Sequence, residues 1–135
     1  MGKIKKPTPK QGSLVKSIEP INTDKLPPIF SLEKIQSGKY CLSQLNEKNK
    51  AMFSDAIYRR KATPWSEIKQ QHRHGLGAEK ISKSSIKAAI PKFITEDVSD
   101  FLVFRYNGMH PMVGYRQREI FYVLWFDHDF TLYDH

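Results

Sequence analysis

The sequence predicts an α+β fold, in which N-terminal helices pack on a C-terminal antiparallel β-meander of about four strands. The chain has 135 residues, of which 39% are hydrophobic, and this is enough for one domain with a modest core. Runs of β-favouring residues, separated by short turn signals, fill the chain from residue 101 onward. Apolar residues at helical spacing lie before that point. Helices therefore come first in the chain and the sheet comes last.

The first 28 residues differ in composition from the rest of the chain. They are rich in lysine and proline and contain few acidic residues. Proline fixes φ and lacks an amide donor, so no helical or strand pattern continues through this segment. We therefore expect residues 1–28 to form a flexible basic arm and residues 29–135 to form a single α+β domain. The arm is either an extension that follows phosphates or an unstructured leader.

Two helices are expected before the sheet. The first spans residues 43–60, because Ser43 is a good N-cap residue and apolar residues at helical spacing follow it. The second spans residues 63–74, where Thr63 and Pro64 match the N-cap and the first helical position. A Gly-Leu-Gly sequence then ends this helix.

A lysine-rich segment, residues 78–90, follows the second helix. Its first residues favour a turn of helix. Lys80, Lys83 and Lys87 are three and four positions apart, so they share one face if the segment is helical. That face is either solvated or part of an RNA-binding surface.

Four strands are expected in the C-terminal third. The first ends at the turn signal Asn107-Gly108, and the third is apolar on both faces, as is typical of a central strand. Residues 127–130 are expected to form a hairpin connection to the last strand. The predicted strands are residues 101–106, 112–117, 120–126 and 131–135.

Alternation along these strands sorts the polar side chains by face. If the register allows it, Arg105, Arg116 and Tyr122 share one open face of the sheet. A guanidinium binds phosphate through two parallel hydrogen bonds, and a tyrosine offers a stacking surface, so such a face suits RNA. The alternative is that the two arginines are ordinary strand residues paired with carboxylates.

The net charge of +8 is the strongest compositional signal. It favours polyanionic partners through phosphate contacts and counterion release, although solubility alone also explains a basic chain. The basic cluster Arg59-Arg60-Lys61 at the end of the first predicted helix is explained equally well by its favourable interaction with the negative end of the helix dipole. The residues expected to contact nucleic acid are Arg59, Arg60, Lys61, Arg73, His74, Lys80, Lys83 and Arg118.

The sequence argues against several classes of protein. No apolar run is long enough to span a bilayer, no secretory leader is recognisable, and the single cysteine excludes an intrachain disulfide. These features favour a cytoplasmic protein without a membrane partner. No phosphate-binding loop, dinucleotide fingerprint or hydrolase motif occurs, and the C-terminal block has no HxH or HExxH pattern of metal ligands. We therefore expect no cofactor and no metal.

Four short motifs follow one another along the C-terminal third: an arginine on one strand, a Tyr-Arg pair on the next, a hydrophobic strand, and a terminal tyrosine or histidine. In this chain they are Arg105, Tyr115-Arg116, Tyr122–Trp125, and Tyr133 or His135. Together with the preceding helices, over residues 43–135, they resemble the small RelE/ParE-like toxins of bacterial toxin–antitoxin systems.

The resemblance implies a cytoplasmic endoribonuclease of the messenger-cleaving type, which needs no metal, and an acidic antitoxin-like protein partner. Arg105 and Arg116 would then bind phosphate, and His135 or Tyr133 would perform acid–base chemistry on the 2′-hydroxyl. With Tyr122, the predicted catalytic set is Arg105, Arg116, Tyr122 and His135.

Two alternatives to a ribonuclease stay open. The first is a non-catalytic module of a small bacterial family that binds nucleic acid or an acidic protein through the same basic surface. The second is an interaction protein whose aromatic C-terminal block pairs with another chain.

Overall fold

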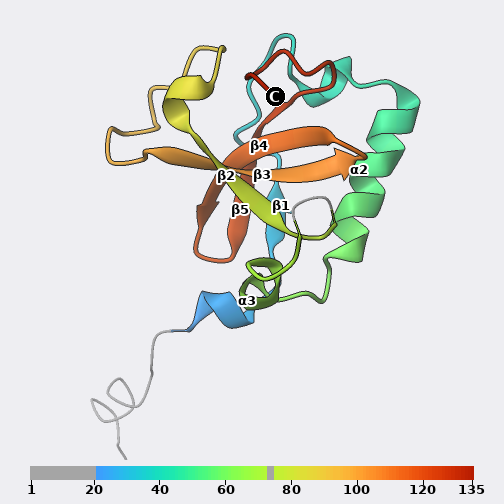
Figure 1. Cartoon of the computed structure of the whole chain (residues 1–135), viewed down its shortest axis with the longest axis vertical. Coiled ribbons are helices and arrows are strands. Elements are labelled where there is room, and N and C mark those ends of the chain that lie inside the picture. The colour runs from blue at the N-terminus through green and yellow to red at the C-terminus, as the bar shows by residue number, and fades with distance from the viewer. Residues whose placement is uncertain (1–20, 73–74) are drawn as a thin grey trace, which may run out of the picture.

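The computed structural model describes residues 21–72 and 75–135. Its centre is a five-stranded sheet with the strand order β1-β5-β4-β3-β2 (Figure 1). The strands are β1 Ile29–Ser31, β2 Ala78–Ser82, β3 Asp100–Asn107, β4 His110–Gln117 and β5 Ile120–Phe126. The helices are α2 Glu47–Arg59 and α3 Trp65–Ile68, with short 3-10 turns η1 Thr23–Lys25, η2 Leu42–Gln44 and η3 Lys83–Ser85. The chain is therefore a mixed α+β protein.

The predicted meander is present as β3, β4 and β5, which pair consecutively and antiparallel. Gly108, with φ 57°, forms the turn between β3 and β4, and Arg118, with φ 59°, forms the turn between β4 and β5. β5 lies between β4 and β1 and is buried on both faces, as predicted for a central strand. β1 runs parallel to β5, with Phe30 opposite Phe121.

The predicted fourth strand is wrong. No strand lies within residues 131–135, and the place beside the meander belongs to β2, which pairs antiparallel with β3. The segment from residue 78 was expected to be a turn of helix. It is extended instead because pairing with β3 satisfies its backbone, which outweighs a weak local helix preference. The C-terminal segment covers the sheet, and Leu132 is fully buried there.

Both predicted helices are shorter in the structure. α2 begins at Glu47, after Asn46, whose side chain accepts a hydrogen bond from the Asn49 amide. The predicted cap, Ser43, lies in η2. α3 is a single turn. Its buried residues are Trp65 and Ile68 alone, and this apolar face is too short to stabilise a longer helix by packing.

The two faces of the sheet are covered differently (Figure 1). On one face, here called the helix face, Phe104 and Phe121 pack with Phe53 of α2 and Trp65 of α3. On the opposite face, here called the loop face, Trp125 packs with residues of the segments 83–98 and 127–135. Because irregular segments instead of a helix cover the loop face, polar side chains can lie there beside the apolar ones.

The ordered domain reaches upstream of the boundary predicted at residue 29. Asp24 in η1 forms ion pairs with Lys69 at 2.7 Å and with Arg116 at 2.6 Å. The Trp65 amide donates to the Leu26 carbonyl at 3.0 Å. Most of the predicted basic arm, residues 1–20, and the predicted RNA contacts Arg73 and His74 lie outside the described residues. Within the described ranges, no helix is both long and apolar enough to cross a membrane.

Candidate functional site

A cleft of about 430 Å³ opens on the loop face, where β2, the end of β3 and the C-terminal segment meet. These three parts of the chain are far apart in sequence, so the cleft exists only in the folded protein. It is lined by Glu79, Ile81, Ser82, Ser85, Arg105, Met109, Tyr133, Asp134 and His135.

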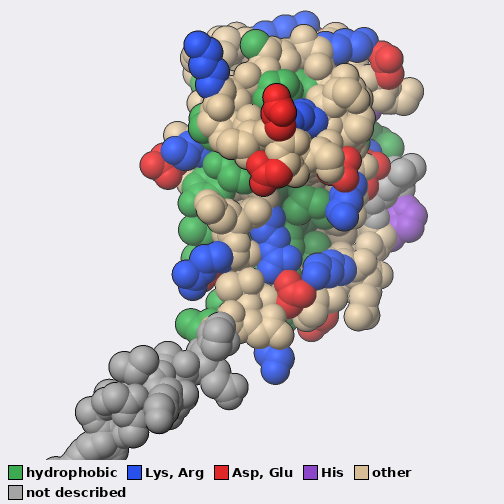
Figure 2. Space-filling view, turned by 90° about the vertical axis from the view of Figure 1, so that its left-hand side faces the viewer, with side chains coloured by type: hydrophobic (Ala, Val, Ile, Leu, Met, Phe, Trp, Pro, Cys, Tyr) green, Lys and Arg blue, Asp and Glu red, His purple; other side chains and the backbone are tan. Residues whose placement is uncertain are grey.

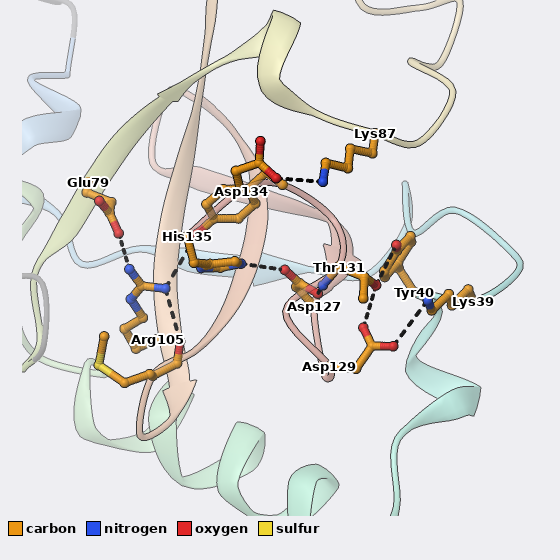
Figure 3. Close-up of polar contacts among 12 residues, drawn as sticks. Lys39, Tyr40, Glu79, Lys87, Arg105, Asp127, Asp129, Thr131, Asp134 and His135 are labelled. Carbon is orange, nitrogen blue, oxygen red and sulfur yellow. Dashed lines mark hydrogen bonds and ion pairs between the residues drawn. The ribbon is translucent and has the colours of Figure 1, made fainter.

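Arg105 is the cation of this cleft. It lies on β3 and is only 8% exposed. Its Nη2 forms an ion pair with Glu79 of β2, and its Nη1 donates to the Met109 carbonyl at 3.0 Å and reaches the Tyr133 hydroxyl at 3.5 Å (Figure 3). The buried Nε has no hydrogen-bond partner among the described residues. The guanidinium is therefore held in one orientation, and its Nε N–H is not used by these contacts.

His135 is positioned by a buried carboxylate. Its Nε2 donates to Asp127 Oδ2 at 2.9 Å, and Asp127 is fully buried (Figure 3). The other Asp127 oxygen accepts from the Thr131 amide at 2.9 Å, so the carboxylate itself is fixed. A proton on Nε2 leaves the lone pair of a neutral imidazole on Nδ1. His135 is therefore arranged to accept a proton at Nδ1.

The Tyr133 ring packs against the His135 ring at a tilt of 33°, with ring centroids 4.1 Å apart. Burial raises the pKa of the Tyr133 hydroxyl above its ordinary value, and Arg105 opposes that shift. Tyr133 consequently stays protonated at neutral pH and keeps a hydrogen to donate inside the cleft.

The C-terminal segment is anchored on both sides (Figure 3). Asp129 accepts from the Thr131 hydroxyl at 2.6 Å and pairs with Lys39 at 3.1 Å, and both contacts lower the pKa of Asp129. Asp134 pairs with Lys87 at 2.6 Å, which lowers its pKa. These contacts explain why a histidine at residue 135 occupies a defined position instead of extending into solvent.

The prediction that Arg105 and Arg116 share a face is wrong. Arg105 pairs in register with Pro111, and directly opposite residues share a face, so alternate residues of β4 counted from Pro111 lie on the loop face. Arg116 falls on the helix face. Its guanidinium lies 4.4 Å from the Trp65 ring centroid and pairs with Asp24. Arg116 therefore fastens η1 and α3 to β4 and is absent from the cleft.

Tyr122 lies on the loop face but at the other end of β5. Its ring stacks on Tyr115 at 5.0 Å, and it is four residues, roughly 13 Å, before the end of the strand at Phe126. It does not line the cleft. Of the predicted catalytic set, the cleft brings together Arg105 and His135.

Arg60 was predicted to contact nucleic acid, and the structure contradicts this. It is fully buried, and its three guanidinium nitrogens donate to the carbonyls of Ala56, Gly75 and Leu76. Burial lowers the pKa of Arg60 to about 10. As the C-cap residue of α2, it turns inward over the Phe104 ring and joins the helix to the following loop.

The other described basic residues of the predicted RNA surface are exposed, except the half-buried Lys83, and they come from separate elements. Arg59 pairs with Asp55 at 3.2 Å, and Lys61 lies over the Tyr58 ring. The rest are Lys80 on β2, Lys83 in η3, which donates to the Thr95 carbonyl, and Arg118 at the β4–β5 turn. They do not form a single helical face.

Basic side chains also border a hydrophobic hollow on one face of the molecule (Figure 2). On the helix side of β2, a hollow of about 490 Å³ combines apolar and cationic side chains. Its lining includes Trp65, Ile68, Lys69, Lys80, Leu102 and Arg116. Two of these three cations, Lys69 and Arg116, already pair with Asp24, whereas Lys80 is exposed on β2.

Sequence reasoning missed Glu79 and the role of Asp127. Glu79 reaches Arg105 only because β2 pairs with β3, and no local pattern signals that pairing. Asp127 was interpreted as a turn former. Its position directly after an apolar strand and eight residues before His135 was the available signal. In the described ranges, His, Cys, Asp and Glu side chains form no group of three placed to hold a metal ion.

No protein-family model, curated protein or solved structure matches this chain, so the resemblance to RelE/ParE-like toxins stays a prediction.

Proposed function

We propose that this protein is a metal-independent endoribonuclease that acts in the cleft around Arg105 and His135. The observation that carries the proposal is the convergence of Glu79, Arg105, Tyr133 and His135 from three segments, with His135 held by buried Asp127. The imidazole can act as the general base, the guanidinium can stabilise phosphate charge and the protonated phenol can act as the general acid, and these are the three roles that metal-independent RNA transesterification uses.

The reaction begins with the 2′-hydroxyl of the RNA. His135 Nδ1 takes its proton, the 2′-oxygen bonds to the adjacent phosphorus, and the bond from phosphorus to the 5′-oxygen breaks. Arg105 balances the negative charge that develops on the phosphate, and the phosphate competes with Glu79 for the guanidinium. The leaving 5′-oxygen takes a proton from the Tyr133 hydroxyl. Exchange with solvent then restores both side chains.

The net charge of +8 supports an RNA substrate, because basic proteins release counterions when they bind nucleic acid. Within the described part of the chain, exposed lysines such as Lys80 and Lys61 are available for phosphates outside the cleft. Binding should therefore weaken as salt rises.

The test is incubation with end-labelled single-stranded RNA in EDTA. We expect products with 2′,3′-cyclic phosphate and 5′-hydroxyl ends, and no cleavage when the scissile nucleotide is 2′-deoxy. Arg105→Ala and His135→Ala should each lower the rate at least 100-fold. Arg116→Ala is the matched control: it removes an arginine from the other face, so cleavage should persist while stability falls. Full activity in His135→Ala, or no cleavage by the wild type, contradicts the proposal.

A second candidate function is a non-catalytic RNA-binding module. It is favoured by the ion pair between Arg105 and Glu79, which neutralises the guanidinium within the protein. Salt-sensitive RNA binding without any cleavage would select this candidate.

A further inference from the structure

Phe130 has a backbone conformation that its side chain disfavours. Its φ is 61°, in the left-handed region, where glycine or asparagine fits with less strain than a bulky residue. Its ring is not part of the core, since Phe130 is 41% exposed. Neither the turn nor the core therefore explains why phenylalanine occupies this position.

The turn around Phe130 is held by other residues. The Thr131 amide donates to Asp127, the Thr131 hydroxyl donates to Asp129, and Lys39 pairs with Asp129. None of these bonds uses the Phe130 side chain, so they hold the turn on both sides of residue 130 without it. Strain of this kind is characteristic of functional positions, where the surrounding structure maintains it.

The exposed ring lies beside the cleft. The Phe130 ring contacts the His135 ring edge to face, with ring centroids 5.1 Å apart. Its centroid also lies 4.5 Å from that of the His110 ring. The His135 ring in turn contacts the tilted ring of Tyr133, and both residues line the cleft. A row of rings thus leads from the cleft to the surface, with Phe130 at an exposed position in it.

We infer that Phe130 is a stacking platform for an unpaired base next to the scissile phosphate, so that the substrate is single-stranded RNA. This inference rests on the proposed function of the cleft. A flat exposed ring stacks on any base, and such contacts are tolerant of sequence. Bases within a duplex are already stacked and paired, and they cannot reach the ring while they remain so.

The test separates the ring from the backbone. Phe130→Asn removes the ring and suits the left-handed conformation, so its melting temperature should equal or exceed that of the wild type. Its kcat/KM for single-stranded RNA should fall roughly 5- to 150-fold, as expected for one lost base-stacking contact. Phe130→Trp keeps a stacking surface and should retain activity within about threefold.

A substrate lacking one base provides the matching arm. Oligonucleotides with an abasic residue on the 5′ or the 3′ side of the scissile phosphate are compared with the intact sequence. One of the two abasic substrates should lower the kcat/KM of the wild type by about the same factor as the Phe130→Asn substitution does. With the Phe130→Asn variant, the same abasic substrate should give little further loss.

The outcomes separate the two proposals. A wild-type protein that cleaves RNA, with Phe130→Asn equally active on every substrate, overturns the platform and leaves the ribonuclease. A wild type that binds RNA without cleaving it, with binding weakened in Phe130→Asn, supports the platform and overturns catalysis. A wild type that neither binds nor cleaves single-stranded RNA overturns both.

Discussion

At the scale of single residues, Asp127 shows how a buried charge is accommodated and used. A buried carboxylate is costly unless hydrogen bonds satisfy it. Asp127 receives one from His135 and one from the Thr131 amide, so its two oxygens hold the C-terminal residue and the turn at once. The same side chain therefore serves the fold and the proposed chemistry.

We expect Asp127→Asn to lower the rate of RNA cleavage by about 100-fold or more. An amide at this position no longer selects the His135 form with its proton on Nε2, so the base loses its orientation. The free energy of unfolding should fall by about 1–3 kcal/mol, because a buried hydrogen bond to a charged group is weakened.

Single-turnover kinetics and urea unfolding measure the two effects. Asp55→Asn is the control: Asp55 lies on α2, outside the cleft, is 53% exposed in its side chain and pairs with Arg59, so both quantities should change little. Unaltered kinetics in Asp127→Asn would show that His135 is not the base.

At the scale of elements, the β4–β5 pairing depends on one glycine. A Cβ on Gly114 would lie 1.9 Å from the Tyr122 carbonyl oxygen, which is far inside contact distance. The pairing shifts register between Val113 and Gly114, so the strands approach closely at an irregular position. This close approach is what requires glycine here.

Gly114→Ala should therefore lower the free energy of unfolding by about 1–3 kcal/mol or more. The atom that clashes with the added methyl group belongs to the Tyr122 backbone, which cannot move aside as a flexible side chain can. Gly108 provides the comparison. It has φ 57° but no atom within 4 Å of an added Cβ, so Gly108→Asn should cost well under Gly114→Ala. Thermal unfolding of both variants decides this, and equal losses would refute the close-approach argument.

At the scale of the whole molecule, ion pairs tie distant segments to the sheet. Asp24 joins η1 to α3 and β4, and Asp129 and Asp134 anchor the C-terminal segment. Hydrogen bonds from Lys69 and then Arg116 lower the pKa of Asp24 below its ordinary value of 3.8. Each such carboxylate stabilises the fold only while it is ionised.

Because these pKa values are depressed on folding, their contribution is present above about pH 4 and disappears as the pH falls through the folded pKa. We expect the free energy of unfolding to decrease as the pH is lowered from about 5 to 2. Asp24→Asn should flatten this dependence. Chemical denaturation at several pH values measures it, and an identical slope in the variant would show that Asp24 does not contribute.

Much of the fold followed from local patterns, whereas the cleft did not. The turn at Asn107-Gly108 and the alternation of β3 to β5 were readable along the chain. The position of Arg116 depended on register, and a shift by one residue reverses its face. Arg60 looked like a surface charge because a residue at a helix end can turn either way, and only its carbonyl partners draw it inward.

The sequence by itself determined the antiparallel meander, the buried central strand and the basic charge, because alternation, turn residues and composition act locally or over the whole chain. Only the tertiary structure decided that β2 brings Glu79 to Arg105, and that the C-terminal segment folds back to place His135 against Asp127. The physical reason is that these contacts join residues many positions apart, whose meeting depends on strand pairing and packing across the sheet.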